Sequence, residues 1–385
     1  MRVPDVSPTV AFDVTALAGV RTGIGLAVAE SLAALERAPN RPRLIPYAFG
    51  AALLGARRTM PRGTRVVPVP TRALLWAWGR AEHPQFDGLL RPARLIHATS
   101  FVSPPSRLPS LVTVHDCAFA RFPEMVSPSV RLFDPILRRA LARGAWLHCS
   151  TETVAAESEE LFGIDLRRAG RLVIVPFGVP RLGPASPLSP AVSERLRGAP
   201  YILALGRLES RKNLPRLVEA FGAIANRHTD LHLVIAGPDG PDRPSTEAVA
   251  SSLEPGMRER VILTGPVGHG ARRTLIEGAA VLSYPSLYEG FGFPMLEAMT
   301  LGVPVVAANG GALPEVAGGA AHLVDPSDPD SIATGLDLVL TDAARRRELI
   351  ALGRVRASAF NWTKTARGLL AAYEDLAGDA ARISS

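Results

Sequence analysis

Two basic and two acidic residues in the second half of the chain are spaced as if to hold a ligand that carries both phosphates and hydroxyls. Arg207 ends the apolar segment YILALGR, and Lys212 stands directly before a helical run that starts at Asn213. Arginine can bond two phosphate oxygens at once, and lysine adds a compact positive charge. Glu289 and Glu297 follow later in the chain. Because carboxylates repel phosphate, we expect them to accept hydrogen bonds from hydroxyl groups. A nucleotide sugar offers both kinds of group.

The stretch SYPSLYEGFGFPMLEAMTLGVP, residues 283–304, must position both carboxylates. Its pattern predicts the end of an apolar strand, a turn through Gly290-Phe291-Gly292, and a helix that starts at Pro294 and stops at Gly302. Backbone N–H groups at a helix start have no partner within the helix, and the helix dipole adds positive potential there. The turn therefore predicts a site for an anion, most simply a phosphate.

A single glutamate on a helix usually lies on a solvated face. Whether Glu289 and Glu297 bind a ligand must therefore be judged from the longer pattern around them. E-G-F-G-F-P-x-L-E-A-M, with its Glu-x7-Glu spacing, strongly resembles the signature of the retaining family 4 glycosyltransferases of the GT-B fold, the glycosyl transferases group 1. That family includes many bacterial mannosyl- and glucosyltransferases. The resemblance extends over most of the chain, through G-R-x4-K-N at 206–213, HD at 115–116 and PEVAGGAAHLVDP at 314–326.

The resemblance implies an α/β protein of the GT-B class, with two facing Rossmann-like domains and a cleft between them. We expect an acceptor-binding domain at 1–180, a linker at 181–199 rich in Pro, Ser and Ala, and a nucleotide-sugar-binding domain at 200–360. Two C-terminal helices are expected at 328–352 and 364–377. In this fold the last helix, about 362–380, packs back on the first domain.

The resemblance also assigns residues to roles. Arg207 and Lys212 would bind the diphosphate, Glu297 the ribose hydroxyls, and Glu289 the sugar hydroxyls or the positive charge that develops at the anomeric carbon. The residues implied as catalytic are His115, Arg207, Lys212 and Glu289. The residues implied in substrate binding are Gly25, Asp116, Gly206, Pro266, Val267, Gly290, Phe291, Gly292 and Glu297.

His115 and Asp116 follow the apolar run SLVTV, so they are expected at the carboxyl end of a parallel strand, where open α/β sheets bind ligands. His115 would orient the sugar or shape the acceptor site; a lone histidine is more often structural. The segment that starts at Ser150 resembles the serine-led S-x-x-T turn of the family, with Thr-Glu-Thr after the serine. Phe177 departs from the family pattern, because it stands where asparagine is usual, which leaves a polar contact in doubt.

The glycine-rich turn after the first strand raises a dinucleotide-binding alternative. Gly19, Gly23 and Gly25 do not follow the G-x-G-x-x-G spacing, and the next strand, RLIPYAF, ends without an acidic residue for a ribose. The pattern therefore disfavours a dehydrogenase. In the family that the chain resembles, this loop lies under the sugar phosphate and acceptor.

No Asp-x-Asp motif or ligand cluster is evident, so we expect neither a metal nor another cofactor, with the nucleotide sugar as a substrate. The two cysteines, Cys117 and Cys149, give no disulfide framework. No apolar run reaches the roughly 18 to 20 residues of a membrane span, and the N-terminus lacks a signal-peptide core. These observations predict a cytoplasmic enzyme, with peripheral contact at the inner face of the membrane as an option.

The charge is uneven along the chain. Residues 1–198 carry 25 Lys and Arg against 15 Asp and Glu, a net +10, whereas residues 199–385 carry 18 against 21, a net −3. The basic half suggests an anionic acceptor or lipid surface. Nucleic acid fits less well, because the aromatics are not interleaved with the arginines. The segment 57–80, with Arg57, Arg58 and Trp76, is either an interfacial helix or a core helix with a basic face.

We therefore expect a metal-independent hexosyltransferase that moves mannose or glucose from a GDP- or UDP-linked sugar to a saccharide or lipid-linked acceptor. Cell-surface polysaccharide or glycolipid assembly would be its setting. The alternatives are a sugar phosphorylase or synthase on the same fold, glycosylation of a soluble natural product, and a nucleotide-sugar sensor without catalysis. A phosphorolysis assay separates the first alternative, and donor hydrolysis without acceptor separates the last.

Overall fold

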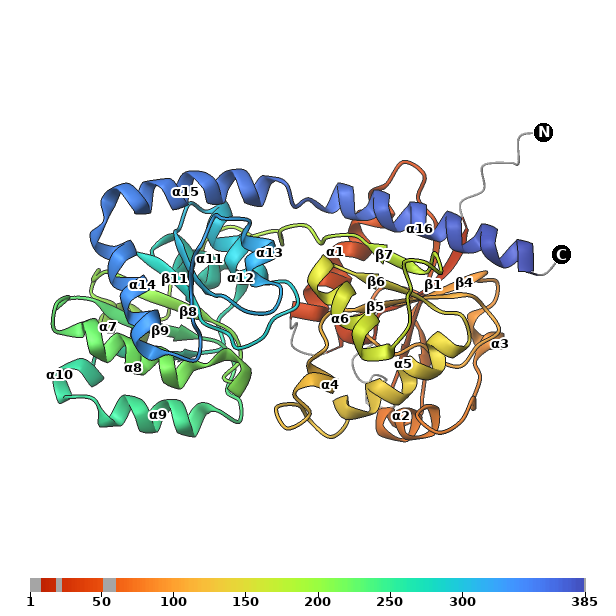
Figure 1. Ribbon diagram of the computed structural model, residues 1–385, viewed down its shortest axis with the longest axis horizontal. Coiled ribbons are helices and arrows are strands. Elements are labelled where there is room, and N and C mark those ends of the chain that lie inside the picture. Colours follow the sequence, from red (N-terminus) through yellow and green to blue (C-terminus); the bar gives the residue numbers. More distant parts are fainter. Residues whose placement is uncertain (1–7, 19–22, 51–59, 384–385) are drawn as a thin grey trace. The chain divides into compact units, whose positions relative to one another are not determined.

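The computed structural model describes residues 8–18, 23–50 and 60–383, and the chain forms two compact units (Figure 1). The first unit comprises Met1–Gly178 and Asn361–Ser385, and the second comprises Val179–Phe360. Each unit is built on a parallel sheet with helices packed against it. The prediction of an α/β protein with two Rossmann-like domains is confirmed.

The described part of the first unit contains a seven-stranded parallel sheet in the order β3-β2-β1-β4-β5-β6-β7. Its central strands are apolar on both faces, as parallel strands covered by helices must be, and Val10, Ala11 and Phe12 of β1 have no exposed surface. The strands are β1 (Thr9–Asp13), β2 (Arg43–Phe49), β3 (Arg65–Val67), β4 (Leu95–Ala98), β5 (Ser110–Val114), β6 (Trp146–Cys149) and β7 (Leu172–Ile174).

The helices of the first unit include segments from both ends of the chain. Helix α16 lies beside α1, so the two ends of the sequence meet on one face of this sheet (Figure 1). The helices are α1 (Gly23–Arg37), α2 (Thr71–Trp78), α3 (Asp87–Leu90), α4 (Ala118–Arg121), α5 (Phe133–Ala142), α6 (Glu152–Phe162) and α16 (Trp362–Ile383), with short 3-10 turns at Thr15–Leu17 and Val130–Leu132. Helix α6 is capped by Thr151, whose Oγ1 accepts the Val154 N–H at 3.3 Å.

The described part of the second unit contains a six-stranded parallel sheet in the order β10-β9-β8-β11-β12-β13. The order reverses between β8 and β11, which are hydrogen-bonded neighbours although about 80 residues separate them. The strands are β8 (Tyr201–Leu205), β9 (His232–Ala236), β10 (Val261–Gly265), β11 (Val281–Tyr284), β12 (Val305–Ala308) and β13 (His322–Val324).

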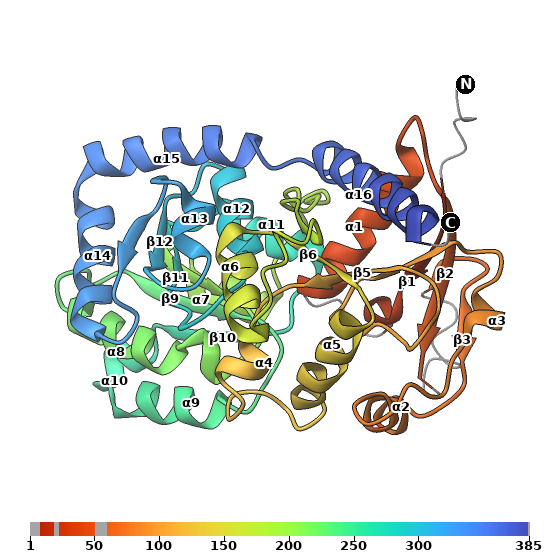
Figure 2. The ribbon, with the colours of Figure 1, turned by 45° about the vertical axis from the view of Figure 1, so that its right-hand side comes forward.

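The helices of the second unit bury apolar faces against this sheet. Helices α8 and α14 lie side by side and close one face of the core through Leu217, Phe221 and Leu336 (Figure 2). The helices are α7 (Pro190–Leu196), α8 (Leu214–Ala225), α9 (Arg243–Ser252), α10 (Pro255–Arg258), α11 (His269–Glu277), α12 (Phe293–Thr300), α13 (Leu313–Ala317), α14 (Pro329–Thr341) and α15 (Ala343–Ser358), with a 3-10 turn at Ser210–Lys212.

Two segments differ from what the sequence pattern predicted. The single helix expected over 328–352 is two helices, because the Asp342 carboxylate accepts the backbone N–H groups of Ala344 and Arg345, both at 2.9 Å, and so caps the start of α15. Residues 181–199, expected as a linker, contain α7, whose Val192 and Leu196 are buried. This segment belongs to the second unit.

The Arg- and Trp-bearing segment folds as a core helix where it is described; Arg57 and Arg58 lie outside the described residues. Leu74, Leu75 and Trp78 of α2 are buried, whereas Trp76 is 57% exposed. The Arg80 guanidinium lies 4.5 Å from the centroid of the Trp76 ring. In the described part of the chain, no helix combines the length and the apolar character needed to cross a bilayer.

Candidate active site

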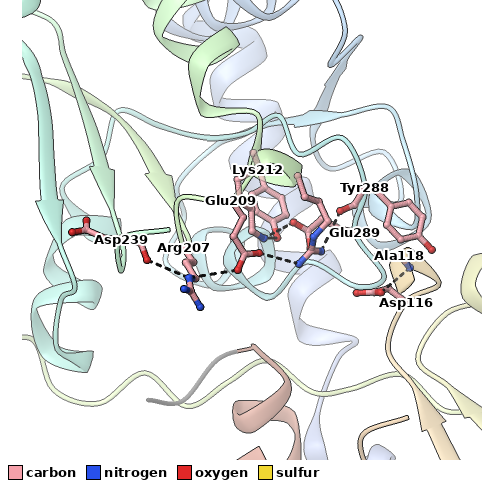
Figure 3. Close-up of polar contacts among 10 residues, drawn as sticks. Asp116, Ala118, Arg207, Glu209, Lys212, Asp239, Tyr288 and Glu289 are labelled. Carbon is pink, nitrogen blue, oxygen red and sulfur yellow. Dashed lines mark hydrogen bonds and ion pairs between the residues drawn. The ribbon is translucent and has the colours of Figure 1, made fainter. Parts of the chain in front are cut away.

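Lys212 and Glu289 meet at the point where the strand order of the second sheet reverses. Lys212 lies in the loop after β8 and Glu289 in the loop after the neighbouring strand β11, so both follow carboxyl ends of adjacent strands. The Lys212 Nζ donates to Glu289 Oε1 at 2.5 Å and lies 3.4 Å from the Tyr284 hydroxyl. Arg211 Nη1 donates to Glu289 Oε2 at 2.9 Å. One carboxylate therefore binds two cations, one through each oxygen, as Figure 3 shows for Lys212.

The environment of Glu289 favours its ionised form. The residue is only 7% exposed, and burial alone would raise the pKa of its carboxyl group. The positive charges of Arg211 and Lys212 outweigh this burial and lower the pKa of Glu289 to about 2. The same surroundings act on Tyr284, because burial and the Glu289 charge raise the pKa of its hydroxyl well above the usual value. At neutral pH the site therefore holds a fixed carboxylate and a neutral phenol.

Arg207 extends the line of charges toward solvent. Its Nε donates to the Asp239 carbonyl at 3.2 Å and lies 3.7 Å from Glu209 Oε1, which is itself in the ion-pair chain that leads to Arg211 (Figure 3). The Arg207 side chain is 56% exposed, in contrast to 14% for Lys212. Arg207 thus retains an accessible guanidinium.

Glycine is required where this loop leaves β8. Gly206 has a φ of +150°, and a Cβ atom there would lie 3.2 Å from Cε of Lys212. A side chain at 206 would therefore press on the lysine stem that reaches Glu289. The structure brings together Gly206, Lys212 and Glu289, three of the residues expected at the site, and it adds Arg211 to them.

Glu297 lies on α12 and makes a separate ion pair. Its side chain is 2% exposed, and Arg272 of α11 contacts Glu297 Oε2 through both Nε, at 3.1 Å, and Nη2. Arg272 was not among the residues expected from the sequence. The arginine precedes its partner by 25 residues and belongs to no recognised motif, so only the packing of α11 against α12 reveals the pair.

The turn between Glu289 and α12 is buried and tightly packed. Gly290, Phe291 and Gly292 are all buried, and the Phe291 and Phe293 rings meet edge to face at 5.1 Å. Gly292 is the N-cap of α12, with a φ of +104°, and Pro294 is the second residue of this helix rather than the first. The Glu289 carbonyl accepts the Ala312 N–H at 2.9 Å, which ties the turn to the loop after β12.

The loop after β10 carries Pro266 and Val267, two of the residues expected in substrate binding. Pro266 is exposed and Val267 is half-buried, and Gly265 adopts a φ of +70° at the end of the strand. Helix α11, which carries Arg272, begins at His269 directly after this loop. The loop with Pro266 and Val267 and the helix with Arg272 are therefore consecutive segments.

In the first unit, His115 follows β5 and is held in one tautomer. Its Nε2 lies 2.8 Å from the Thr99 carbonyl, which can only accept, so Nε2 carries the proton and Nδ1 is left as an acceptor. Burial lowers the pKa of His115 to about 4, so the ring is neutral at physiological pH. Phe177 stacks on this ring with centroids 5.6 Å apart, so the residue that replaces the family's asparagine makes an apolar contact.

The two other site residues expected in the first unit also have structural contacts. Asp116 Oδ1 accepts the Ala118 N–H at 3.0 Å and so supports the start of α4 (Figure 3). Gly25 is buried in the first turn of α1. Within residues 8–18, 23–50 and 60–383, no group of three or more His, Cys, Asp or Glu side chains is arranged to hold a metal ion.

Comparisons with a family model and with known proteins indicate the same family for this chain. The family model described as Glycosyl transferases group 1 matches residues 188–356. The O-antigen chain mannosyltransferase B of Escherichia coli is 30% identical over 285 residues, which cover 73% of this chain and 74% of that protein.

Solved structures share the fold over nearly the whole chain. The sucrose-phosphate synthase of Thermosynechococcus elongatus aligns over 96% of this chain and 99% of its own, with a TM-score of 0.71 and 22% identity. Anabaena Alr3699/HepE, solved in complex with UDP and glucose, covers 96% of this chain and 100% of its own, with a TM-score of 0.70 and 18% identity. These likenesses confirm the GT-B fold class predicted from the sequence.

Proposed function

Because this chain belongs to the glycosyl transferases group 1 family, we propose that it transfers a hexose of the mannose or glucose type from a GDP- or UDP-linked sugar. The acceptor would be a saccharide or a lipid-linked saccharide. The mannosyltransferase named among the relatives supports mannose and cell-surface polysaccharide assembly as the setting. The observation that carries the proposal is the buried Glu289 carboxylate with Lys212 and Arg211 at the reversal point of the second sheet.

In the proposed reaction, the bond between the anomeric carbon and the β-phosphate oxygen of the donor breaks. The acceptor hydroxyl oxygen bonds to the same face of that carbon, and its proton passes to the departing phosphate oxygen. The products are a glycoside with retained configuration and a nucleoside diphosphate. Negative charge grows on the leaving group as the bond breaks, so fixed cations lower the barrier selectively.

The residues of the second unit suit the two ends of that bond. Arg207 and Lys212 would stabilise the diphosphate, with Arg211 adding charge and holding Glu289. A carboxylate with a pKa of about 2 stays ionised throughout the physiological range, so Glu289 would stabilise the positive charge that develops at the anomeric carbon. Glu297 would bind the ribose hydroxyls, and the backbone around Pro266 and Val267 would contact the base.

For the first unit we propose the acceptor role, with His115 presenting Nδ1 to a sugar hydroxyl. The Nε2–H···O=C bond to Thr99 fixes this acceptor without further reorganisation. The net charge of +10 over residues 1–198 would favour an acceptor that carries phosphate or is linked to an anionic lipid. The proposal includes independence from metal ions, because Arg207, Arg211 and Lys212 would supply the positive charge that a divalent cation supplies elsewhere.

The test is a thermal-shift panel of GDP-mannose, GDP-glucose, UDP-glucose and ADP-glucose, followed by assay of nucleoside diphosphate release, all in the presence of EDTA. We expect one guanine or uracil donor to raise the melting temperature, since a ligand that binds only the folded state stabilises it. The same donor should be slowly hydrolysed without acceptor, and Lys212→Ala should abolish this hydrolysis. No stabilisation by any donor would contradict the proposal. Activity lost in EDTA and restored by Mg²⁺ or Mn²⁺ would contradict metal independence.

A further inference from the structure

Glu297 presents its two carboxylate oxygens to different surroundings. Both hydrogen bonds from Arg272 end on Oε2, and Oε1 has no hydrogen-bond partner among the described residues. A buried carboxylate is costly unless its charge is compensated, and Arg272 is the cation that compensates it. The pair thus leaves one oxygen of a fixed carboxylate able to accept further hydrogen bonds.

Arg272 is placed to contact the same ligand as Glu297. It lies in the first turn of α11, where its backbone N–H donates to the Gly268 carbonyl at 2.8 Å. Its side chain is 24% exposed, whereas that of Glu297 is 2% exposed, so Arg272 reaches solvent beside a carboxylate that is almost fully buried. Nη1 makes no hydrogen bond among the described residues. The Arg272 charge also lies close enough to Tyr284 to oppose the upward pKa shift that burial and Glu289 impose on that hydroxyl.

The neighbouring arginine shows what an ordinary surface position on this helix looks like. Arg273 pairs with the exposed Glu277 of its own helix at 2.8 Å and donates to the Gly183 carbonyl at 3.2 Å. Neither contact involves a residue of the candidate site. Arg272 and Arg273 are therefore matched in type and helix but differ in the residues they contact.

We propose that Arg272 is a nucleotide-positioning residue, which holds Glu297 through Oε2 so that Oε1 accepts the hydroxyls of the donor ribose. This inference rests on the function proposed above and adds a residue to its donor site. Arginine suits the task because its guanidinium is always charged and its Nε and Nη2 both donate to Oε2, which holds that oxygen in place. With a neutral residue at 272, Glu297 would lose both its charge compensation and its orientation.

The experiment measures binding of nucleoside diphosphates with and without ribose hydroxyls. Titration calorimetry would compare GDP with 2′,3′-dideoxy-GDP, and UDP with 2′,3′-dideoxy-UDP, in the wild type, Glu297→Gln, Arg272→Leu, Arg272→Gln and Arg273→Leu. For the base that the wild type binds, we expect the ribose form to bind roughly tenfold or more tightly, because hydrogen bonds to a charged group are among the stronger ones. Glu297→Gln and both Arg272 variants should remove most of this preference. Arg273→Leu should keep it.

The outcomes distinguish a failure of the role proposed for Arg272 from a failure of the proposed function. If Arg272→Leu or the milder Arg272→Gln weakens both forms of the nucleotide equally and keeps the preference, Arg272 has only a structural role and the inference fails while the proposed function stands. A wild type without preference for the ribose form also overturns the inference. A wild type that binds neither GDP nor UDP contradicts the proposed function itself. A preference lost in Arg273→Leu as well would also overturn the inference, because the loss would not be specific to Arg272.

Discussion

At the residue scale, the chemistry proposed for the second unit depends on carboxylates that are buried with arginine or lysine. Glu289 is held by Arg211 and Lys212, and Glu297 is held by Arg272. Removing one partner of a buried ion pair leaves the other charge uncompensated, which costs more than the pair itself contributes. These contacts therefore fix the positions of the side chains that the ligand would meet.

The pKa of Glu289 predicts how its contribution to stability depends on pH. The pKa of about 2 in the folded protein lies below the ordinary value of 4.5, so the folded state favours the ionised form. The stabilisation is therefore fully present above about pH 4.5 and is lost as the pH falls toward 2. We expect the difference in unfolding free energy between the wild type and Glu289→Gln to be constant near neutral pH and to shrink in acid. Urea titrations at several pH values would measure it, and a difference that grows below pH 4.5 would refute the assignment.

Arg207 is expected to act in catalysis rather than in folding, because its side chain is 56% exposed. Arg207→Ala should lower the rate of sugar transfer by roughly 100-fold or more, since a lost contact to developing charge typically costs a few kcal/mol. The circular dichroism spectrum and melting temperature should stay unchanged. Arg227→Ala is a matched control, because Arg227 is similarly exposed, at 59%, and pairs with Asp337 instead. Near-normal turnover in Arg207→Ala would remove this residue from the site.

Substitutions of the two glutamates should affect different steady-state kinetic parameters. Glu297→Gln should mainly raise the donor KM, because ribose contacts are equally strong in the ground and transition states. Glu289→Gln should mainly lower kcat, because its charge is matched to the transition state. Initial rates over a range of donor concentrations would distinguish the two effects. If both variants changed only the KM, the proposed division of roles would be wrong.

At the element scale, backbone geometry positions α12 relative to Glu289. Gly292, the N-cap of this helix, has a φ of +104°, and a Cβ atom there would lie 2.9 Å from Cδ2 of Leu313. Gly292→Ala should lower the unfolding free energy by about 1–3 kcal/mol through backbone strain alone, and it should weaken donor binding as well. Chemical denaturation and thermal shift would measure both. Gly310→Ala is the control, because a Cβ atom there meets its nearest atom at 3.5 Å and no positive φ is involved. Equal effects of the two substitutions would contradict this argument.

A chain of polar side chains joins the last helix to the sheet of the first unit, and its hydrogen-bond directions can be assigned. The Val175 carbonyl can only accept from His148 Nε2, at 2.9 Å, so His148 Nδ1 accepts from the Thr113 hydroxyl. Thr113 in turn accepts from His97 Nε2, and His97 Nδ1 accepts from the Tyr373 hydroxyl at 2.6 Å. Burial lowers the pKa of both histidines, so the chain stays neutral and anchors α16 against β4 and β5.

At the scale of the whole molecule, the excess of positive over negative charge is confined to the first half of the chain, residues 1–198. Several arginines of α5 and its C-terminal end are already paired locally, for example Arg139 and Arg143 with Glu82. Trp76 and Arg80 form an exposed pair on α2 and its end, which makes them candidates for contact with an anionic surface. The surplus of positive charge and this exposed pair support the proposal that the acceptor is linked to a lipid of an anionic membrane.

Co-sedimentation with lipid vesicles tests whether the protein binds an anionic membrane. We expect binding to anionic vesicles at low salt, weaker binding at high salt because of screening, and little binding to neutral vesicles. Trp76→Ala should reduce vesicle binding and leave nucleotide binding intact. Val355→Ala is the control, because Val355 is an exposed apolar residue, at 72%, that belongs to the second unit. Equal binding to both vesicle types, or none to either, would favour a soluble acceptor.

The sequence by itself determined the local elements and the identity of several site residues. Alternation of apolar runs with helical patterns predicted the parallel strands, and glycine and proline marked the turn from 289 to 294. It also singled out Gly206, Lys212 and Glu289, because fixed spacing within a strand–loop–helix unit constrains which side chains reach the carboxyl end of a strand. Asp342 is a residue type that often caps helices, but the helical pattern continues on both sides of it, so the sequence did not predict the boundary between α14 and α15.

Only the tertiary structure decided which charges meet. Lys212 and Glu289 are 77 residues apart, and Arg272 and Glu297 are 25 apart, so their contacts depend on the strand order of the second sheet and on how α11 packs against α12. A sequence shows that an arginine is present but not which carboxylate it compensates, because an ion pair forms across whichever elements the core brings together. For that reason the motifs point to Lys212 and Glu289, whereas the roles of Arg211 and Arg272 as their partners follow only from the folded structure.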